Sequence, residues 1–359
     1  MNKKNSHRTR RAALTILVVP AAVALGAASA SAASAAPPSA RQGGTGPVIT
    51  GLRTVETFNY DAGGQPENVT INPDGSLTVS LLGFLTGQPP QLLHISRSGQ
   101  VTVLVTGEPG EAIGGNARDS AGTIYYNLLS GDPARSGLWR LRPGGSPERI
   151  GALPAGQFLN GLTIDAAGEN LYAADSLAGT IWTVPTSGGP VKAWLVSPAL
   201  APLEPGPGHF GVNGVTYHNG AVWASNTDRQ TLLRIPVTAT GAPGPVQVVA
   251  GNLTGIDDFK FLAGRSDVAF VALNSANEVA AVFPDGRTKI VATSADGLDS
   301  PTDTAVRGSQ IFITDGGGNP PHNAQLQAGK INFAALVKEN DMTLDKQLRR
   351  ASEMRRRNS

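Results

Sequence analysis

The sequence predicts an all-β fold, a six-bladed β-propeller whose N-terminal strand closes the last blade. Short apolar stretches with alternating polar residues recur along the chain, separated by turns rich in Gly, Asn and Asp. Residues 158–184 contain one complete unit of strand, turn, strand, turn and strand. Equivalent positions in four successive units, Asn160, Asn213, Asp257 and Thr302, are 53, 44 and 45 residues apart. Periods of about 40 to 50 residues with four short strands each are typical of propeller blades.

Residues 1–36 are predicted to form an export signal peptide that is not part of the fold. A head with five Lys and Arg residues precedes an apolar stretch at 12–26, and small residues suited to signal cleavage follow it. Arg10 and Arg11 are compatible with a twin-arginine signal, and an uncleaved anchor is the alternative. We therefore expect a secreted or cell-envelope protein with no membrane span after signal removal. Residues 37–47 are expected to be a flexible leader.

The predicted propeller spans residues 48–333. Residues 52–60 alternate like a strand, and the last unit ends near Phe333 with only three strands, so we expect the N-terminal strand to complete that blade and protect its edge. Loops of unequal length are expected on one face of the ring, where function usually lies. Residues 334–359 are expected to form a polar, basic tail.

Composition excludes several classes of function. The chain has no cysteine, which excludes thiol catalysis, thiolate metal sites and disulfides. Its 29 Lys and Arg residues are concentrated at the ends, so residues 37–337 hold 17 basic and 23 acidic side chains. An acidic body argues against nucleic acid as a partner. We expect a monomer that takes a small polar molecule at its central channel.

Alignment of the units places one residue of each inner strand near the ring axis: Glu67, Gly114, Asn160, Asn213, Asp257 and Thr302. Five of these six carry a side-chain oxygen, and polar neighbours adjoin them: Asn68, Asn116, Asp258 and Asp303. Oxygens that converge from several blades suit a hard divalent cation, with calcium the first choice. The alternative is a structural role, because Asn and Asp at strand starts also cap turns.

Three short motifs carry a resemblance to a known family. Pro66-Glu67, Asn160-Gly161 followed by LYAADS, and Asn213-Gly214 followed by AVWAS resemble the senescence marker protein/gluconolactonase (regucalcin-like) family. The resemblance covers most of residues 60–333 and suggests an exported bacterial member. It implies that Glu67, Asn160 and Asn213 hold a divalent cation. The family has Asp where this chain has Asn213, and an Asn can coordinate a metal but cannot accept a proton.

A hydrolase with this departure needs another base. Asp257, one blade further on, and His209, in the loop that leads into Asn213, are the candidate catalytic residues; His322 in the last blade is a third candidate. The predicted function is cation-dependent hydrolysis of a small lactone or ester. The alternatives are a propeller that binds a ligand or envelope partner without catalysis, and a magnesium-dependent lyase. The sequence has no G-x-S-x-G, phosphate-loop or His-Glu-x-x-His motif.

Overall fold

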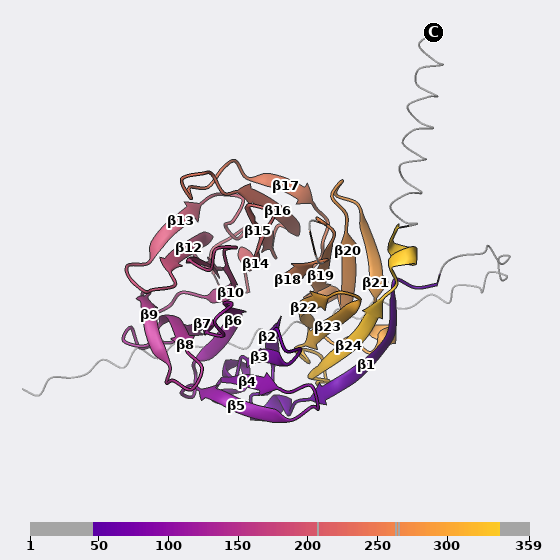
Figure 1. Ribbon diagram of the computed structural model, residues 1–359, viewed down its shortest axis with the longest axis horizontal. Coiled ribbons are helices and arrows are strands. Elements are labelled where there is room, and N and C mark those ends of the chain that lie inside the picture. Colours follow the sequence, from indigo (N-terminus) through magenta and orange to yellow (C-terminus); the bar gives the residue numbers. More distant parts are fainter. Residues whose placement is uncertain (1–45, 207, 263, 265, 338–359) are drawn as a thin grey trace, which may run out of the picture. The chain divides into compact units, whose positions relative to one another are not determined.

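The computed structural model describes residues 46–206, 208–262, 264 and 266–337. These residues form six four-stranded antiparallel sheets arranged around one axis (Figure 1). The predicted six-bladed β-propeller is therefore confirmed. The predicted signal peptide, most of the leader and most of the basic tail lie outside the described residues. Among the described residues, no helix has the length and hydrophobicity needed to span a membrane.

Five blades each pair four consecutive strands, with the first strand of each nearest the middle of the ring (Figure 1). Blade 1 contains β2 (Pro66–Ile71), β3 (Leu77–Leu81), β4 (Gln91–Ile95) and β5 (Val101–Thr106). Blade 2 contains β6 (Ala112–Arg118), β7 (Ile124–Leu129), β8 (Gly137–Leu141) and β9 (Glu148–Ala152). Blade 3 contains β10 (Leu159–Ile164), β11 (Asn170–Asp175), β12 (Thr180–Pro185) and β13 (Lys192–Val196).

Blade 4 contains β14 (Val212–His218), β15 (Ala221–Asn226), β16 (Thr231–Pro236) and β17 (Gln247–Ala250). Blade 5 contains β18 (Ile256–Phe261), β19 (Ala269–Leu273), β20 (Glu278–Val282) and β21 (Thr288–Ala292). Where the connecting loops are described, they contain four single-turn 3-10 helices, η1 (Tyr60–Ala62), η2 (Phe84–Thr86), η3 (Asn274–Ala276) and η4 (Ser294–Asp296).

Blade 6 is assembled from both ends of the propeller. Its strands are β22 (Pro301–Arg307), β23 (Gln310–Asp315), β24 (Gln325–Ile331) and β1 (Ile49–Thr57). The pairing of β1 with β24 joins Ile49 to Ile331 and Thr57 to Gln325. The closure predicted from the missing fourth strand is confirmed, and it removes an exposed edge at the junction.

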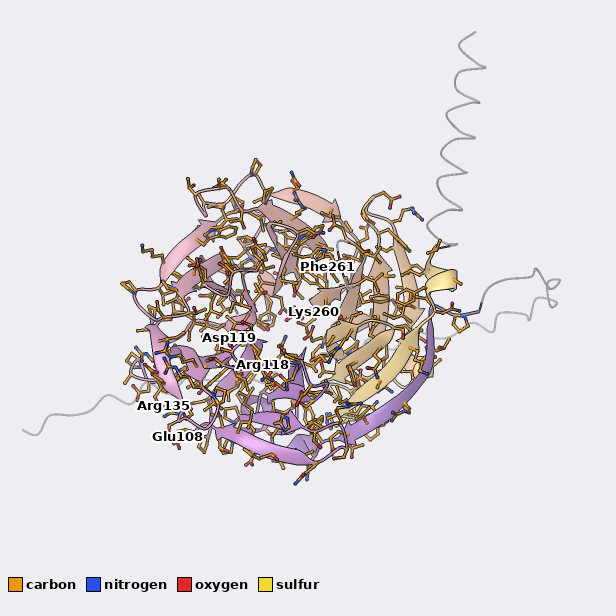
Figure 2. The ribbon with its side chains drawn as sticks, in the orientation of Figure 1. Glu108, Arg118, Asp119, Arg135, Lys260 and Phe261 are labelled. Atoms are coloured by element: carbon orange, nitrogen blue, oxygen red, sulfur yellow. The ribbon has the colours of Figure 1, made fainter. Side chains whose placement is uncertain are left out.

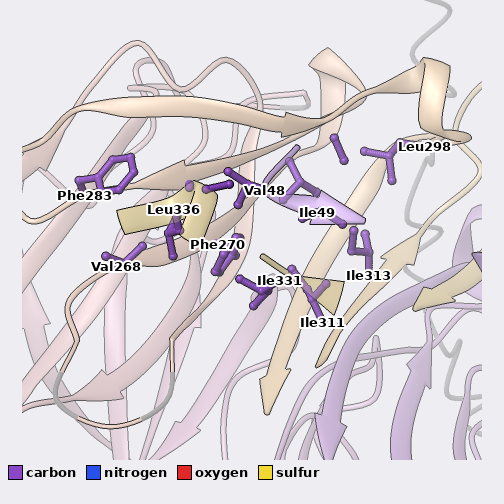
Figure 3. Packing of buried hydrophobic residues seen from close by; sticks show 14 residues of the cluster. Val48, Ile49, Val268, Phe270, Phe283, Leu298, Ile311, Ile313, Ile331 and Leu336 are labelled. Atoms are coloured by element: carbon purple, nitrogen blue, oxygen red, sulfur yellow. The ribbon is translucent and has the colours of Figure 1, made fainter. Parts of the chain in front are cut away.

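The buried cluster at this junction ties the closing strand to blades 5 and 6 (Figure 3). Val48 and Ile49 pack with apolar side chains of β19, β20, β23 and β24. Ala335 and Leu336, which follow β24, are also buried in this cluster. Side chains from both ends of the propeller therefore share one core, which fixes the ring in its closed form.

Every inner strand shifts register near its start, where the bulged chain approaches the ring axis. The second strand of four blades supplies a side-chain acceptor for a backbone N–H of this bulge. These pairs are Asn68 N to Ser80 Oγ (3.2 Å), Gly114 N to Asn127 Oδ1 (3.0 Å), Gly214 N to Ser225 Oγ (2.7 Å) and Asp303 N to Thr314 Oγ1 (3.0 Å).

The glycines of the two Asn-Gly pairs allow inner strands to pack closely. A Cβ on Gly161 would lie 2.6 Å from the backbone nitrogen of Val215 in the next blade. A Cβ on Gly214 would lie 2.7 Å from the Cα of Asp258, again one blade further on. Glycine is therefore required by packing at these positions, while the preceding Asn remains available for the channel.

Candidate functional site

Four of the predicted site residues meet in one cavity at the end of the channel where the inner strands begin. Glu67, Asn160, Asn213 and Asp257 line a cavity of about 290 Å³. They come from β2, β10, β14 and β18, and each is less than a tenth exposed. Thr302 of β22 does not line this cavity; its hydroxyl donates to the Pro66 carbonyl at 3.1 Å.

The orientation of the Asn213 amide follows from its hydrogen bonds. The Thr227 hydroxyl donates to the Ile256 carbonyl at 2.8 Å, which uses its only hydrogen. Thr227 Oγ1 can then only accept from Asn213, so the atom that lies 3.0 Å away is the donor Nδ2. Asn213 Oδ1 is left buried, without a hydrogen-bond partner among the described residues. Such an oxygen is available to a cation.

Two carboxyl groups share the cavity with the amides. Burial, together with the nearby charges of Asp258 and Asp303, raises the pKa of Glu67 to about 8. Burial, followed by the charge of Glu67, raises the pKa of Asp257 well above its ordinary value. Asp257 Oδ1 is also buried without a hydrogen-bond partner in the described part of the chain. Both groups are costly to ionise unless a positive charge lies beside them.

A second set of polar and charged side chains follows the aligned residues by one position on the inner strands β2, β18 and β22. We call this set the charged layer. Asn68 Nδ2 donates to Asp258 Oδ2 at 3.0 Å and to Asp303 Oδ2 at 2.8 Å. Lys260 Nζ lies 3.5 Å from Asp258 Oδ1 and 3.3 Å from Asp303 Oδ1. Figure 2 shows Lys260 toward the middle of the ring. One lysine thus faces two carboxylates in this layer, and the channel as a whole favours an added cation.

Lys260 was missed by sequence reasoning, although Asn68, Asp258 and Asp303 were identified. The alternation of a strand places Lys260 on the same face as Asp258, two residues earlier. Burial alone would lower the pKa of Lys260, but Asp258 and Asp303 more than offset this effect and raise the pKa. The alternation in DDFKF was the signal that could have revealed it.

The donor set fits a hard cation. Its members are carboxylate and amide oxygens, the ligands that calcium and magnesium prefer. The described residues contain no group of three His, Cys, Asp or Glu side chains suited to a metal ion. A cation at this place would therefore need the amide oxygens of Asn160 and Asn213 in addition to the carboxylate of Glu67.

The two predicted histidines lie elsewhere on the loops. His209 Nδ1 lies 3.1 Å from Asp228 Oδ2, and the ring does not line the cavity. His322 Nδ1 donates to the Gly317 carbonyl at 2.7 Å, and its ring stacks on Tyr60 at a centroid distance of 4.1 Å. The structure brings Asp257 to the predicted ligands but neither of these histidines.

An apolar wall on one side of the cavity was also missed. Three aromatic rings line it, Phe84, Phe158 and Phe210, together with Leu82, Leu85, Leu129 and Leu159. Phe158 and Phe210 lie two and three residues before the aligned Asn160 and Asn213. This recurrence before two inner strands is the sequence signal that could have found the wall.

Comparison with known proteins supports the fold. No protein family model matches this sequence, and no curated protein does. A protein assigned as a gluconolactonase shares 17% identity with a TM-score of 0.57, over 78% of this chain and 92% of its own. Virginiamycin B lyase from Staphylococcus aureus shares 14% with a TM-score of 0.53, over 79% and 99%.

An auxiliary nutrient binding protein from Bacteroides ovatus shares 10% identity with a TM-score of 0.61, over 79% of this chain and 76% of its own. Identities this low establish the shared propeller and leave activity open, since these three proteins differ in what their names say they do. Function must therefore be argued from the site itself.

Proposed function

We propose that this protein is a gluconolactonase-like propeller that hydrolyses a lactone or ester with the help of a divalent cation. The observation that carries the proposal is the convergence of four oxygen-bearing side chains from four blades, two of which have a buried oxygen without a partner among the described residues. Buried polar atoms are normally paired, so unpaired oxygens on two residues that line one cavity favour a bound cation. Calcium is the first expectation.

Each residue has a distinct part in this proposal. Glu67, Asn160 and Asn213 would hold the cation, with Asn213 oriented by Thr227. The bound cation would supply polarisation of the substrate carbonyl and acidification of water. Asp257 would accept the proton of the water whose oxygen attacks the carbonyl carbon, and would return that proton to the alkoxide as the ester C–O bond breaks. A carboxylate whose pKa is raised by burial is a stronger base than an ordinary Asp.

Calorimetry tests the cation site directly. Chelator-treated protein is titrated with calcium chloride and then with magnesium chloride, in parallel with Glu67→Gln and the exposed control Glu169→Gln. We expect one cation per chain for the wild type and the control, and none for Glu67→Gln. Absence of binding by the wild type at millimolar calcium, or equal binding by Glu67→Gln, would remove the cation from the proposal.

Asp257→Asn separates catalysis from binding alone. Loss of at least one hundred-fold in kcat with retained cation binding is expected for a general base. If the wild type binds the cation but hydrolyses no lactone or ester, the alternative of a non-catalytic binding propeller is favoured. The presence of Asn213 where the resembling family has Asp is the observation behind that alternative.

We also propose that the protein is exported, because residues 1–36 have the features of a signal peptide. Mass spectrometry of the protein recovered from the culture medium should show a chain that begins after the small-residue segment. A chain that retains Met1 and stays with the cells would contradict export.

A further inference from the structure

The cavity of the proposed hydrolase has two chemically different sides. Its floor carries the oxygen-bearing residues, and blades 4 and 5 add Thr227, Asn274 and Ser275. The rest of the lining consists of phenylalanine and leucine side chains from blades 1 to 4, whose three rings contact one another. A polar floor beside an apolar wall is the arrangement of a site that orients a ligand by its polar end and buries its apolar end.

The wall is a continuous row of aromatic rings. Phe84 and Phe158 contact edge to face, with ring centroids 6.1 Å apart and planes at 76°. Phe158 and Phe210 follow at 5.1 Å and 54°. All three rings are partly exposed, and Leu85 beside them is 51% exposed. Apolar surface gathered beside a polar site costs solvation free energy, which a bound apolar group would recover.

The backbones of two of these phenylalanines donate a hydrogen bond to an Asp carboxylate. Asp175 Oδ1 accepts from the backbone N–H of Phe158 at 3.3 Å. Asp228 Oδ1 accepts from the backbone N–H of Phe210 at 3.2 Å, and Phe210 returns a carbonyl to Asp228 N at 2.9 Å. An Asp carboxylate thus fixes the backbone of Phe158 one residue before β10 and that of Phe210 two residues before β14. The wall is therefore preorganised by the scaffold.

We propose that the substrate is a lipophilic lactone or ester, with its carbonyl at the polar floor and an alkyl or aromatic group against Phe84, Phe158 and Phe210. This inference rests on the proposed function for the reaction and on the apolar wall for the substrate class. It replaces the small polar molecule expected from the sequence. A volume of about 290 Å³ has room for roughly ten non-hydrogen atoms, so the apolar group is short.

A series of γ-lactones of increasing chain length tests this inference. γ-Butyrolactone, γ-hexalactone, γ-octalactone and γ-dodecalactone are compared with gluconolactone at saturating calcium. We expect kcat/KM to rise about three- to fourfold for each methylene group. The increase should level off near γ-octalactone, which has about the number of non-hydrogen atoms that the cavity can hold. Equal rates across the series, or gluconolactone as the best substrate, would overturn the inference.

Variants locate the effect on the wall. Phe158→Ala should lower kcat/KM for γ-octalactone at least tenfold and leave kcat/KM for γ-butyrolactone nearly unchanged, so that the dependence on chain length becomes flatter. Val248→Ala, at an exposed position on the outer strand β17, is the matched control and should behave as the wild type. Circular dichroism of each variant confirms that the fold is retained.

A binding measurement keeps this inference separate from the proposed reaction. Fluorescence of the neutral probe N-phenyl-1-naphthylamine should increase on binding to the wild type and to Glu67→Gln, and at least tenfold less affinity is expected for Phe158→Ala. The γ-lactones should displace the probe in order of chain length. If they do so but none is hydrolysed, the substrate-class inference stands and the proposed reaction fails. If Phe158→Ala binds the probe as the wild type does, the apolar wall is not the binding surface.

Discussion

At the scale of single residues, the fixed amide of Asn213 is the most informative feature of the site. The hydroxyl of Thr227 donates its hydrogen to the Ile256 carbonyl and accepts from Asn213 Nδ2, so the Asn213 oxygen is the unpaired atom of the amide. Groups that orient a metal ligand influence affinity nearly as much as the ligand does. In the proposed cation site, Thr227 would therefore be a positioning residue that does not itself bind the cation.

Removal of that hydroxyl should loosen the cation. We expect Thr227→Val to lower calcium affinity by about 10- to 100-fold, because the Asn213 amide is then free to rotate. Calorimetric titration measures the change, and Thr216→Val on the same blade provides a control that lies away from the cavity. Unchanged affinity in Thr227→Val would show that Asn213 is not a ligand.

The change Asn213→Asp should have opposite effects with and without cation. The variant places a third carboxyl group in the cavity beside Glu67 and Asp257. Without a cation this group is costly to ionise, so the chelated protein should unfold at a lower temperature. An added negative ligand should tighten calcium binding by at least tenfold. Thermal unfolding with chelator and with excess calcium measures both, and a smaller calcium-induced shift than in the wild type would count against the site.

The sequence was sufficient to identify Glu67, Asn160, Asn213 and Asp257 as neighbours. Rotational repetition brings equivalent positions of each blade to one radius, so register alone predicts their meeting. It was insufficient for Phe84, which belongs to the loop between β3 and β4 and has no equivalent position in the inner-strand alignment. Loop side chains depend on loop conformation, which repetition does not determine.

At the scale of elements, the bulge at the start of each inner strand links folding to function. The bulge leaves a backbone N–H that the ladder does not use, and the neighbouring strand supplies its acceptor. In blade 4 that acceptor is the fully buried Ser225, which receives a bond from Gly214 N. Ser225 in the mostly apolar strand AVWASN thus has a structural reason that periodicity alone could not reveal.

Loss of this acceptor should be costly. Ser225→Ala leaves a buried N–H unsatisfied, which is expected to lower the free energy of unfolding by about 1 to 3 kcal/mol. Urea unfolding measures the change, and Ser98→Ala in an exposed turn should stay within about 0.5 kcal/mol of the wild type. A Ser225→Ala protein as stable as this control would mean that the bulge finds another partner.

The long loop before blade 4 gives His209 a role that the sequence did not suggest. His209 and the backbone of Phe210 bind the same carboxylate, that of Asp228. We expect His209→Ala to raise KM for γ-octalactone several-fold and to leave kcat and its pH profile unchanged, because the loop that carries Phe210 is less constrained. A loss of kcat on all lactones would instead support the catalytic role predicted from the sequence.

At the scale of the whole molecule, the ring brings several buried carboxyl groups together where its inner strands converge. Closure by β1 prevents the blades from separating to expose these groups. The irregularity at the two ends of the repeat was enough to predict that closure, because a three-stranded last blade needs a partner. The pKa shifts of these carboxyl groups could not be predicted from the sequence, because they depend on how deeply each group is buried.

These buried carboxyl groups predict an unusual dependence of stability on pH. Burial raises the pKa of Glu67 to about 8, of Asp303 to about 7 and of Asp315 to about 8, whereas carboxyls in the unfolded chain titrate near 4. Between those values the folded protein binds more protons than the unfolded chain, so the free energy of unfolding must fall as pH rises. Each such group contributes at most about 1.4 kcal/mol per pH unit within this window.

We therefore expect the thermal midpoint of chelated protein to be higher at pH 5 than at pH 8. Saturating calcium should flatten this dependence, because a cation beside Glu67 favours its ionised form at every pH. Asp315 does not line the cavity, so Asp315→Asn should make the thermal midpoint of the chelated protein depend less on pH, without changing the effect of calcium on that midpoint. Scanning calorimetry at several pH values measures these midpoints. A midpoint that rises from pH 5 to pH 8 in the chelated protein would show that these carboxyls are not held neutral by burial, and the electrostatic argument for a cation in the channel would lose its basis.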